Sequence, residues 1–157
     1  MTLPKPPLAF VTGPSCWHND SMALYLSQEW LNEAREALDG SEVFVKAARG
    51  TLTATFQHHI TDVPAGAGGE DIAFWSEFQQ GRCVDVRLGE LSSPDVTLTA
   101  PYSLWKRFHA GEVGLAGALL SLDLEVKTRL STALSLTRYW RLYGMNRILS
   151  TVPTRYD

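Results

Sequence analysis

The sequence predicts a single α+β domain of 157 residues, with about five mainly antiparallel strands and helices packed on one face of the sheet. Three observations support this fold class. Residues 51–61 alternate between apolar and polar with a period of two, as a half-buried strand does. Residues 27–40 repeat their apolar positions with helical spacing. Helical patterns are gathered before and after the strands instead of alternating with them, which favours α+β over a parallel α/β sheet.

The composition is that of a globular domain, with 45% apolar and 20% charged residues. The net charge of −3 gives no general attraction to a polyanion, so no nucleic-acid partner is expected. The apolar run from Leu8 to Val11 is too short for a signal segment or a transmembrane segment. We therefore expect a cytoplasmic protein. Transient contact with a membrane is compatible with this expectation. Cys16 and Cys83 lie far apart without ligand-forming neighbours, so neither a metal site nor a disulfide is predicted.

The N-terminal part divides into an arm and a helix. Residues 1–20 hold four of the eight prolines, which predicts an extended arm. The helix begins after Ser27, a good capping residue, and ends at Gly40, which suits the left-handed position that follows a helix. Residues 41–48 are expected to add a further turn or two.

The strands follow in order. After residues 51–61 comes a flexible link over residues 64–69, then a strand over residues 72–78. The pair Gln80-Gly81 predicts a two-residue turn, because glycine tolerates positive φ. The strand over residues 82–88 is expected to alternate. One face would carry Val84, Val86 and Leu88, and the other Cys83, Asp85 and Arg87. A short fourth strand contains Val96 and Leu98.

The C-terminal part predicts three helices and a closing strand. Thr99 or Ala100 caps a helix with Pro101 in its first turn and Gly111 at its end. A smaller helix covers residues 113–121, and the closing strand covers residues 122–127. The last helix, from residue 128 to about residue 149, is apolar on more than one side, so it is expected to contact the sheet and either the arm or a second subunit. A second copy of the chain, forming a homodimer through this helix, is therefore one expected partner. Residues 151–157 are expected to be a tail.

Bulky apolar residues from sheet and helices are interleaved with small ones such as Ala54 and Gly117. This pattern fits either a filled core or an apolar tunnel between the layers, and the residues alone leave both open. The candidate ligand-binding residues are Phe56, His58, Phe74, Phe78, Trp105, Phe108, Leu119, Leu120, Leu124 and Leu134. His58 or Ser76 would orient the polar end of a ligand.

Several motifs occur in one characteristic order. They are the segment LSQEWL, the Gly81 turn, DVTLTAPY, Gly111-Glu112 and LDLEVKTRL. In this order the chain resembles the sterol carrier protein type 2 (sterol-binding) domain family, as a stand-alone bacterial member, with residues 21–150 as the domain. The resemblance implies an apolar tunnel for fatty acids, acyl-CoA or sterols. Leu122 and Thr128-Arg129 depart from the family pattern, which has Gly and Gly-Asp there, and predict a less sharp junction.

Catalytic signals are weak. His58 and His59 are neighbours on a strand and point to opposite faces, so they do not share a metal ion. No nucleophile-elbow pattern and no phosphate-binding glycine loop is present, and no cofactor is expected. The first hypothesis is therefore non-enzymatic binding or transfer of a hydrophobic ligand. The alternative is an accessory or dimerisation domain with a packed core, favoured by the apolar excess at Tyr139, Trp140 and Tyr143, and an independent enzyme ranks third.

Overall fold

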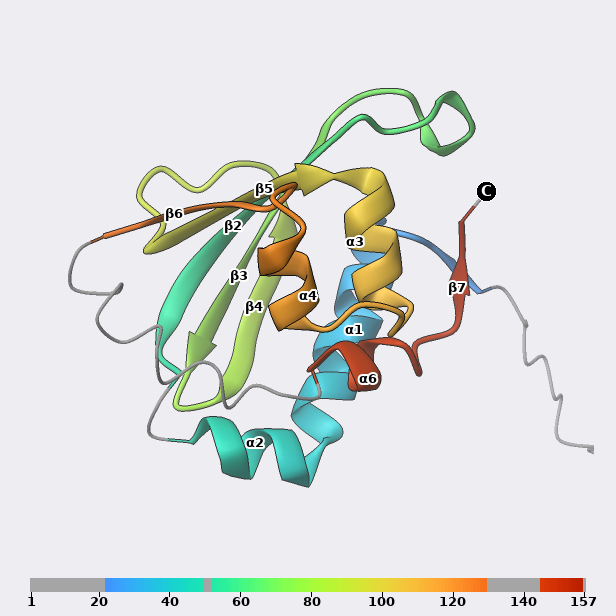
Figure 1. Cartoon of the computed structure of the whole chain (residues 1–157). Coiled ribbons are helices and arrows are strands. Elements are labelled where there is room, and N and C mark those ends of the chain that lie inside the picture. The colour runs from blue at the N-terminus through green and yellow to red at the C-terminus, as the bar shows by residue number, and fades with distance from the viewer. Residues whose placement is uncertain (1–21, 50–51, 130–144, 157) are drawn as a thin grey trace, which may run out of the picture.

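The computed structural model describes residues 22–49, 52–129 and 145–156. It confirms the α+β class: a five-stranded sheet in the order β4-β3-β2-β5-β6 has the helices α1, α3, α4 and α6 gathered on one side of it (Figure 1). All neighbouring strands are antiparallel except β2 and β5, which are parallel. The strands are β2 (Ala54–Thr61), β3 (Ile72–Gln79), β4 (Arg82–Leu88), β5 (Val96–Pro101) and β6 (Glu125–Thr128).

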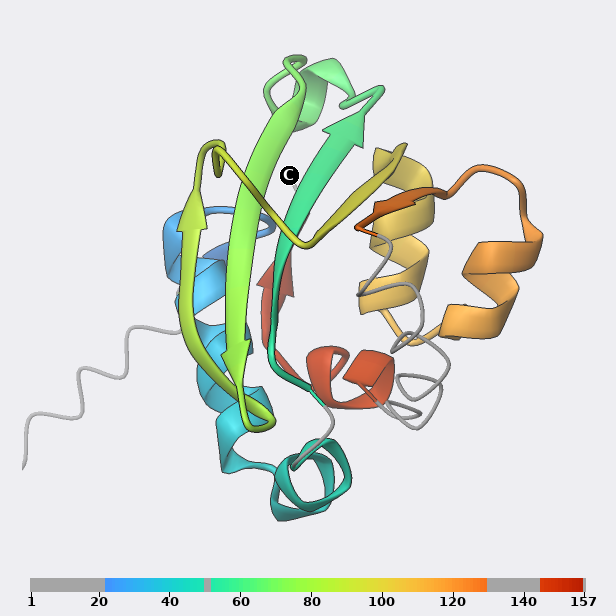
Figure 2. The same ribbon diagram turned by 90° about the vertical axis from the view of Figure 1, so that its left-hand side faces the viewer.

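The connection from β4 to β5, residues 89–95, crosses the outer face of β3 and β2 (Figure 2). Gln57, on this outer face of β2, is only 2% exposed because its amide bonds to the connection. Its Nε2 donates to the carbonyl oxygen of Gly89 at 3.1 Å, and its Oε1 accepts from the backbone N–H of Leu91 at 2.7 Å. The carboxylate of Asp95 accepts from the backbone N–H of Thr55 at 2.9 Å. These bonds fix the crossover that places β5 beside β2.

The hairpin between β3 and β4 confirms the predicted turn at Gln80-Gly81, whose φ angles are 52° and 83°. The predicted faces of β4 are wrong at Cys83 and Val84, because a bulge interrupts the pairing with β3 next to Phe78, whereas Val86 faces the core as predicted. Cys83 and Val86 face the core and are 3% and 6% exposed, whereas Val84 is 41% exposed. One extra residue in a strand moves the residues that follow it to the other face.

The first helix begins at its predicted cap, but Gly40 is its last residue and does not take the left-handed position predicted for it. The helix α1 (Gln28–Gly40) begins after Ser27, whose hydroxyl accepts from the backbone N–H of Trp30 at 3.1 Å. The short helix α2 (Glu42–Ala48) begins after Ser41, whose hydroxyl accepts from the N–H of Phe44 at 3.3 Å. Between β2 and β3, the 3-10 turn η1 (Ala65–Ala67) occupies the expected link.

The C-terminal elements differ from the prediction in their bounds. Pro101 ends β5 and stands at the cap of α3 (Tyr102–His109), because the predicted caps Thr99 and Ala100 are paired with β2. The helix α4 (Leu115–Leu120) is shorter than expected. Leu122 takes a φ of 62° and is 92% exposed, so the strand β6 begins only at Glu125.

Two short strands join the ends of the described fold. The strand β1 (Ala23–Leu24) pairs in parallel with β7 (Thr154–Arg155), and Val152 is buried. Residues 152–156 thus pack on the domain, although a tail was expected there. The strand β6 extends to Thr128, where the last helix was expected to begin, and α6 (Met145–Leu149) lies at the C-terminal end of the range expected for that helix. The predicted arm and residues 130–144 lie outside the described residues.

Candidate functional site

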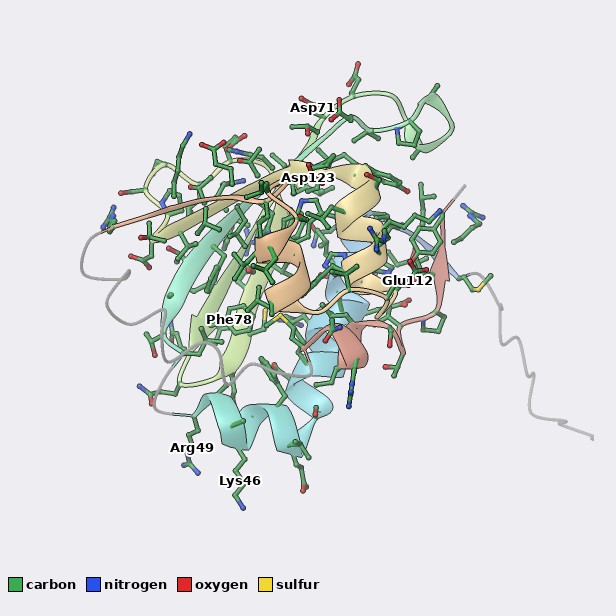
Figure 3. All side chains as sticks on the ribbon, viewed as in Figure 1. Lys46, Arg49, Asp71, Phe78, Glu112 and Asp123 are labelled. Atoms are coloured by element: carbon green, nitrogen blue, oxygen red, sulfur yellow. The ribbon has the colours of Figure 1, made fainter. Side chains whose placement is uncertain are left out.

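An apolar cavity of about 260 Å³ lies between the sheet and the helices. The strands β2 to β6 supply one wall, and α1, α3, α4 and α6 supply the other. Phe78 extends from β3 into the interior between the sheet and the helices (Figure 3). Ala100, Gly114 and Ala118 line the cavity beside much larger side chains. Small residues therefore leave room where large neighbours keep the two layers apart.

The structure brings most of the candidate ligand-binding residues together around this cavity. Eight of the ten line it: Phe56, His58, Phe74, Phe78, Trp105, Phe108, Leu119 and Leu124. Leu120 does not line it and is 81% exposed, because α4 ends at this residue with Ala118 on its buried side. Leu134 lies outside the described residues.

Sequence reasoning missed the contribution of α1 to the cavity wall. Trp30, Leu31, Ala34 and Leu38 all line the cavity. Their helical spacing identified a buried face, but nothing in the sequence indicated which surface that face covers. Cys83 was missed as well, because the β4 bulge that turns it inward was not predicted.

His58 lies at the centre of an aromatic group. Its ring is stacked on Phe74 with centroids 4.2 Å apart and planes 7° apart, and Trp105 meets it edge-on at 5.3 Å. Phe56 and Phe78 form a further T-shaped pair at 5.8 Å. Such pairs fix ring positions better than aliphatic contacts do, so this end of the cavity has a defined shape.

Burial keeps His58 uncharged. Desolvation lowers the pKa of His58 to about 3, with smaller contributions from His109 and His59. Its Nε2 lies 3.4 Å from the hydroxyl of Ser76, a long contact, and its Nδ1 has no hydrogen-bond partner among the described residues. The buried indole Nε1 of Trp105 also has none. Two buried polar atoms of these cavity-lining side chains therefore lack a hydrogen-bond partner within the described structure.

A second buried histidine, His109, was not recognised in the sequence. Its Nδ1 forms a 2.6 Å hydrogen bond with the hydroxyl of Tyr25, and desolvation lowers its pKa to about 3. Burial raises the pKa of Tyr25 well above its usual value, so both side chains remain neutral near pH 7. This bond ties α3 to the segment before α1. A histidine at the end of a helix gives no sequence signal that separates burial from exposure.

The cavity wall carries little charge. Arg35 of α1 is the one charged side chain among its described lining residues, and its guanidinium lies 3.5 Å from the carbonyl oxygen of Val84. Burial raises the pKa of the Cys83 thiol to about 12, so it stays protonated and a poor nucleophile. Within the described ranges, no three His, Cys, Asp or Glu side chains form a group suited to a metal ion. The described helices include none long and apolar enough to span a bilayer.

No family model matches the sequence, and no curated protein matches it. Solved structures do. A sterol carrier protein 2 crystal structure superposes with a TM-score of 0.68 at 20% identity, covering 80% of this chain and 97% of that one. A conserved protein from Thermus thermophilus, described as possibly a sterol carrier protein, gives 0.70 at 20% identity, with coverage of 87% and 94%. UbiJ-SCP2, a ubiquinone synthesis protein, gives 0.50 at 14% identity, with coverage of 74% and 87%. The chain therefore has the fold of the sterol carrier protein type 2 domain family.

Proposed function

We propose that this protein is a lipid-binding domain of the sterol carrier type 2 family that holds a hydrophobic small molecule in the cavity between sheet and helices. The observation that carries the proposal is the cavity itself, because most protein interiors are packed without voids of this size. A fold shared with sterol carrier protein 2 supports the same function.

The size of the cavity suggests the size of the ligand. An apolar cavity of about 150 Å³ accommodates benzene, so by proportion about 260 Å³ accommodates roughly ten non-hydrogen atoms. Burying such a chain contributes about 25 cal/mol for each Å² of apolar surface removed from water. A medium-length acyl or alkyl chain, or part of a larger lipid, fits this estimate.

The chemistry of the site favours binding without catalysis. His58 and Ser76 are the one pair in the described wall that resembles a base and a nucleophile, at 3.4 Å. The remaining ring nitrogen of His58 has no carboxylate to orient it, and the histidine is uncharged and deeply desolvated. A catalytic serine needs a positioned base with such an orienting group.

Displacement of a fluorescent fatty acid and mass spectrometry of extracts of the purified protein test the proposal. The variant Ala118→Phe places a ring in the cavity, and we expect it to reduce probe binding at least tenfold. Leu120→Phe places the same ring on the exposed side of α4 and should leave binding unchanged. Absence of any bound lipid and of any probe binding by the wild type would remove the proposed function.

An accessory role is the second candidate, favoured by the similarity to UbiJ-SCP2, whose description names ubiquinone synthesis. The residues that motivated a dimer, Tyr139, Trp140 and Tyr143, lie outside the described residues. Sedimentation of the wild type against Trp140→Ala and Tyr143→Ala distinguishes this candidate. A monomer in all three proteins argues against a dimer, whereas a dimer lost in the variants supports it.

A further inference from the structure

Two hydrogen-bonding atoms in the cavity wall lack partners. Nδ1 of His58 and Nε1 of Trp105 are both buried, and neither forms a hydrogen bond within the described structure. Their rings lie 5.3 Å apart, and both side chains line the cavity. Leaving a buried polar atom unbonded costs about 1–3 kcal/mol, and native proteins retain few such atoms. Two of them on neighbouring rings indicate a place where a partner from outside the chain binds.

The chemistry around these atoms selects the kind of partner. Trp105 is a donor only, whereas the neutral ring of His58 supplies one donor and one acceptor. The hydroxyl of Ser76, 3.4 Å from His58 and 6% exposed, adds a third polar group. A carboxylate next to this group would be desolvated, which is costly, because the one charged side chain of the described wall, Arg35, bonds to Val84 and is not part of this group. A hydroxyl or carbonyl oxygen carries no charge and accepts from the Trp105 indole N–H.

His58 is able to turn its polar edge toward a ligand. Its ring lies parallel to Phe74, within 7°, at a centroid distance of 4.2 Å. A half-turn about the bond between Cβ and the ring keeps this stack, because the ring stays in the same plane. That torsion is soft and roughly two-fold in histidine. The turn gives up only the long contact to Ser76 and exchanges the positions of ring nitrogens and ring carbons.

We propose that His58, Ser76 and Trp105 form a polar subsite that holds an uncharged oxygen of the ligand, so that the cavity selects neutral lipids that carry a hydroxyl or carbonyl group. This inference rests on the proposed function, since it assigns an orientation to a ligand in the same cavity. The apolar part of the ligand then extends along Phe56 and Phe78.

Three ligands with the same ten-carbon chain test the subsite: decanol, decanoate and decane. Their affinities are measured by probe displacement at pH 7.5 for the wild type and for Trp105→Phe. Decane reports the change in apolar contact alone, so the comparison isolates the indole N–H. One hydrogen bond is worth about 1 kcal/mol, and we expect Trp105→Phe to weaken decanol about fivefold more than decane. Decanoate should lose no more than decane. Phe108→Leu, a change in the same wall without a polar atom, should affect all three ligands alike.

A spectroscopic measurement on the wild type makes the test independent of variant stability. The five tryptophans give five indole N–H resonances, and Trp105→Phe or selective labelling assigns the one of Trp105. Decanol should move this resonance downfield, as a new hydrogen bond does, and decane should not. Equal losses for decanol and decane, with an unmoved resonance, would mean that trapped water serves these atoms, and the subsite would be rejected while ligand binding stood. Failure of all three ligands to displace the probe would reject both proposals.

Discussion

The backbone of Ala48 lies directly against the turn residue Gly81. A β-carbon at position 81 would stand 2.7 Å from the carbonyl carbon of Ala48, and Gly81 has a φ of 83°. Gly81→Ala therefore introduces both a left-handed strain and a clash with α2, and we expect it to lower the free energy of unfolding by at least about 2 kcal/mol. Gly69→Ala is the matched control, with a φ of 72° and its nearest contact at 3.6 Å, and should cost about 1 kcal/mol. Urea denaturation measures the free energy of unfolding of both variants. Equal losses would show that α2 moves away from the added methyl group without destabilising the protein.

The two buried histidines predict a loss of stability in mild acid. The pKa of both His58 and His109 in the folded protein is lowered to about 3 from a usual value of 6.5. Between these values the unfolded chain binds protons that the folded chain does not, so stability is complete above pH 6.5 and falls as the pH decreases. Each histidine contributes about 1.4 kcal/mol per pH unit, or about 2.7 kcal/mol for the pair. Denaturation midpoints at pH 7, 6 and 5 measure the slope. His58→Phe keeps the stack on Phe74 and should halve it, and a flat profile would contradict the burial.

The backbone conformation at Leu122 predicts that a glycine variant is more stable than an alanine variant at this position. It has a φ of 62° and is 92% exposed, so its side chain contributes almost no burial and its backbone is strained. Leu122→Gly should relieve about 1 kcal/mol of strain, partly offset by the entropy of glycine in the unfolded chain. Leu122→Ala keeps the strain. We therefore expect the glycine variant to be the more stable of the two by thermal unfolding, and the reverse order would show that this junction is not left-handed.

The crossover over the outer face depends on Gln57. Gln57→Leu removes the partners of the Gly89 carbonyl and the Leu91 N–H, and we expect a cost of about 3 kcal/mol. Gln79→Leu at the exposed end of β3, where the amide bonds only to Glu77 among the described contacts, should change stability by less than about 0.5 kcal/mol. Hydrogen exchange adds a local measurement: in Gln57→Leu the amide of Leu91 should lose its protection. If that amide stays protected, Gln57 does not hold the connection in place.

Local signals in the sequence predicted much of this fold. Period-two alternation identified β2, and Ser27 marks a helix start because a hydroxyl at the cap satisfies a free N–H of the first turn. The turn at Gln80-Gly81 follows from the tolerance of glycine for positive φ. Each of these depends on residues within about four positions of one another. They therefore need no knowledge of the tertiary structure.

The features that were missed depend on distant partners. The bulge in β4 moves Cys83 inward, and it is visible only in the pairing with β3. The positions of α1 over the cavity and of β7 beside β1 are also set by contacts between segments far apart in the chain. For the site, the aromatic positions were predictable from alternation along β2 and β3. His109 was not, because its burial depends on Tyr25, which precedes it by 84 positions.

The pairing of β1 with β7 has a consequence for folding during synthesis. Ala23 is paired with Thr154, so this contact closes a loop of 131 positions, and Trp30 gains its 2.8 Å bond to Thr154 only when that strand arrives. Contacts of such long range form slowly, and chains emerge from the ribosome with the N-terminal part first. The nascent helix α1 can therefore pack on β4 early, but it gains its contact with β7 only when nearly all of the domain has left the exit tunnel.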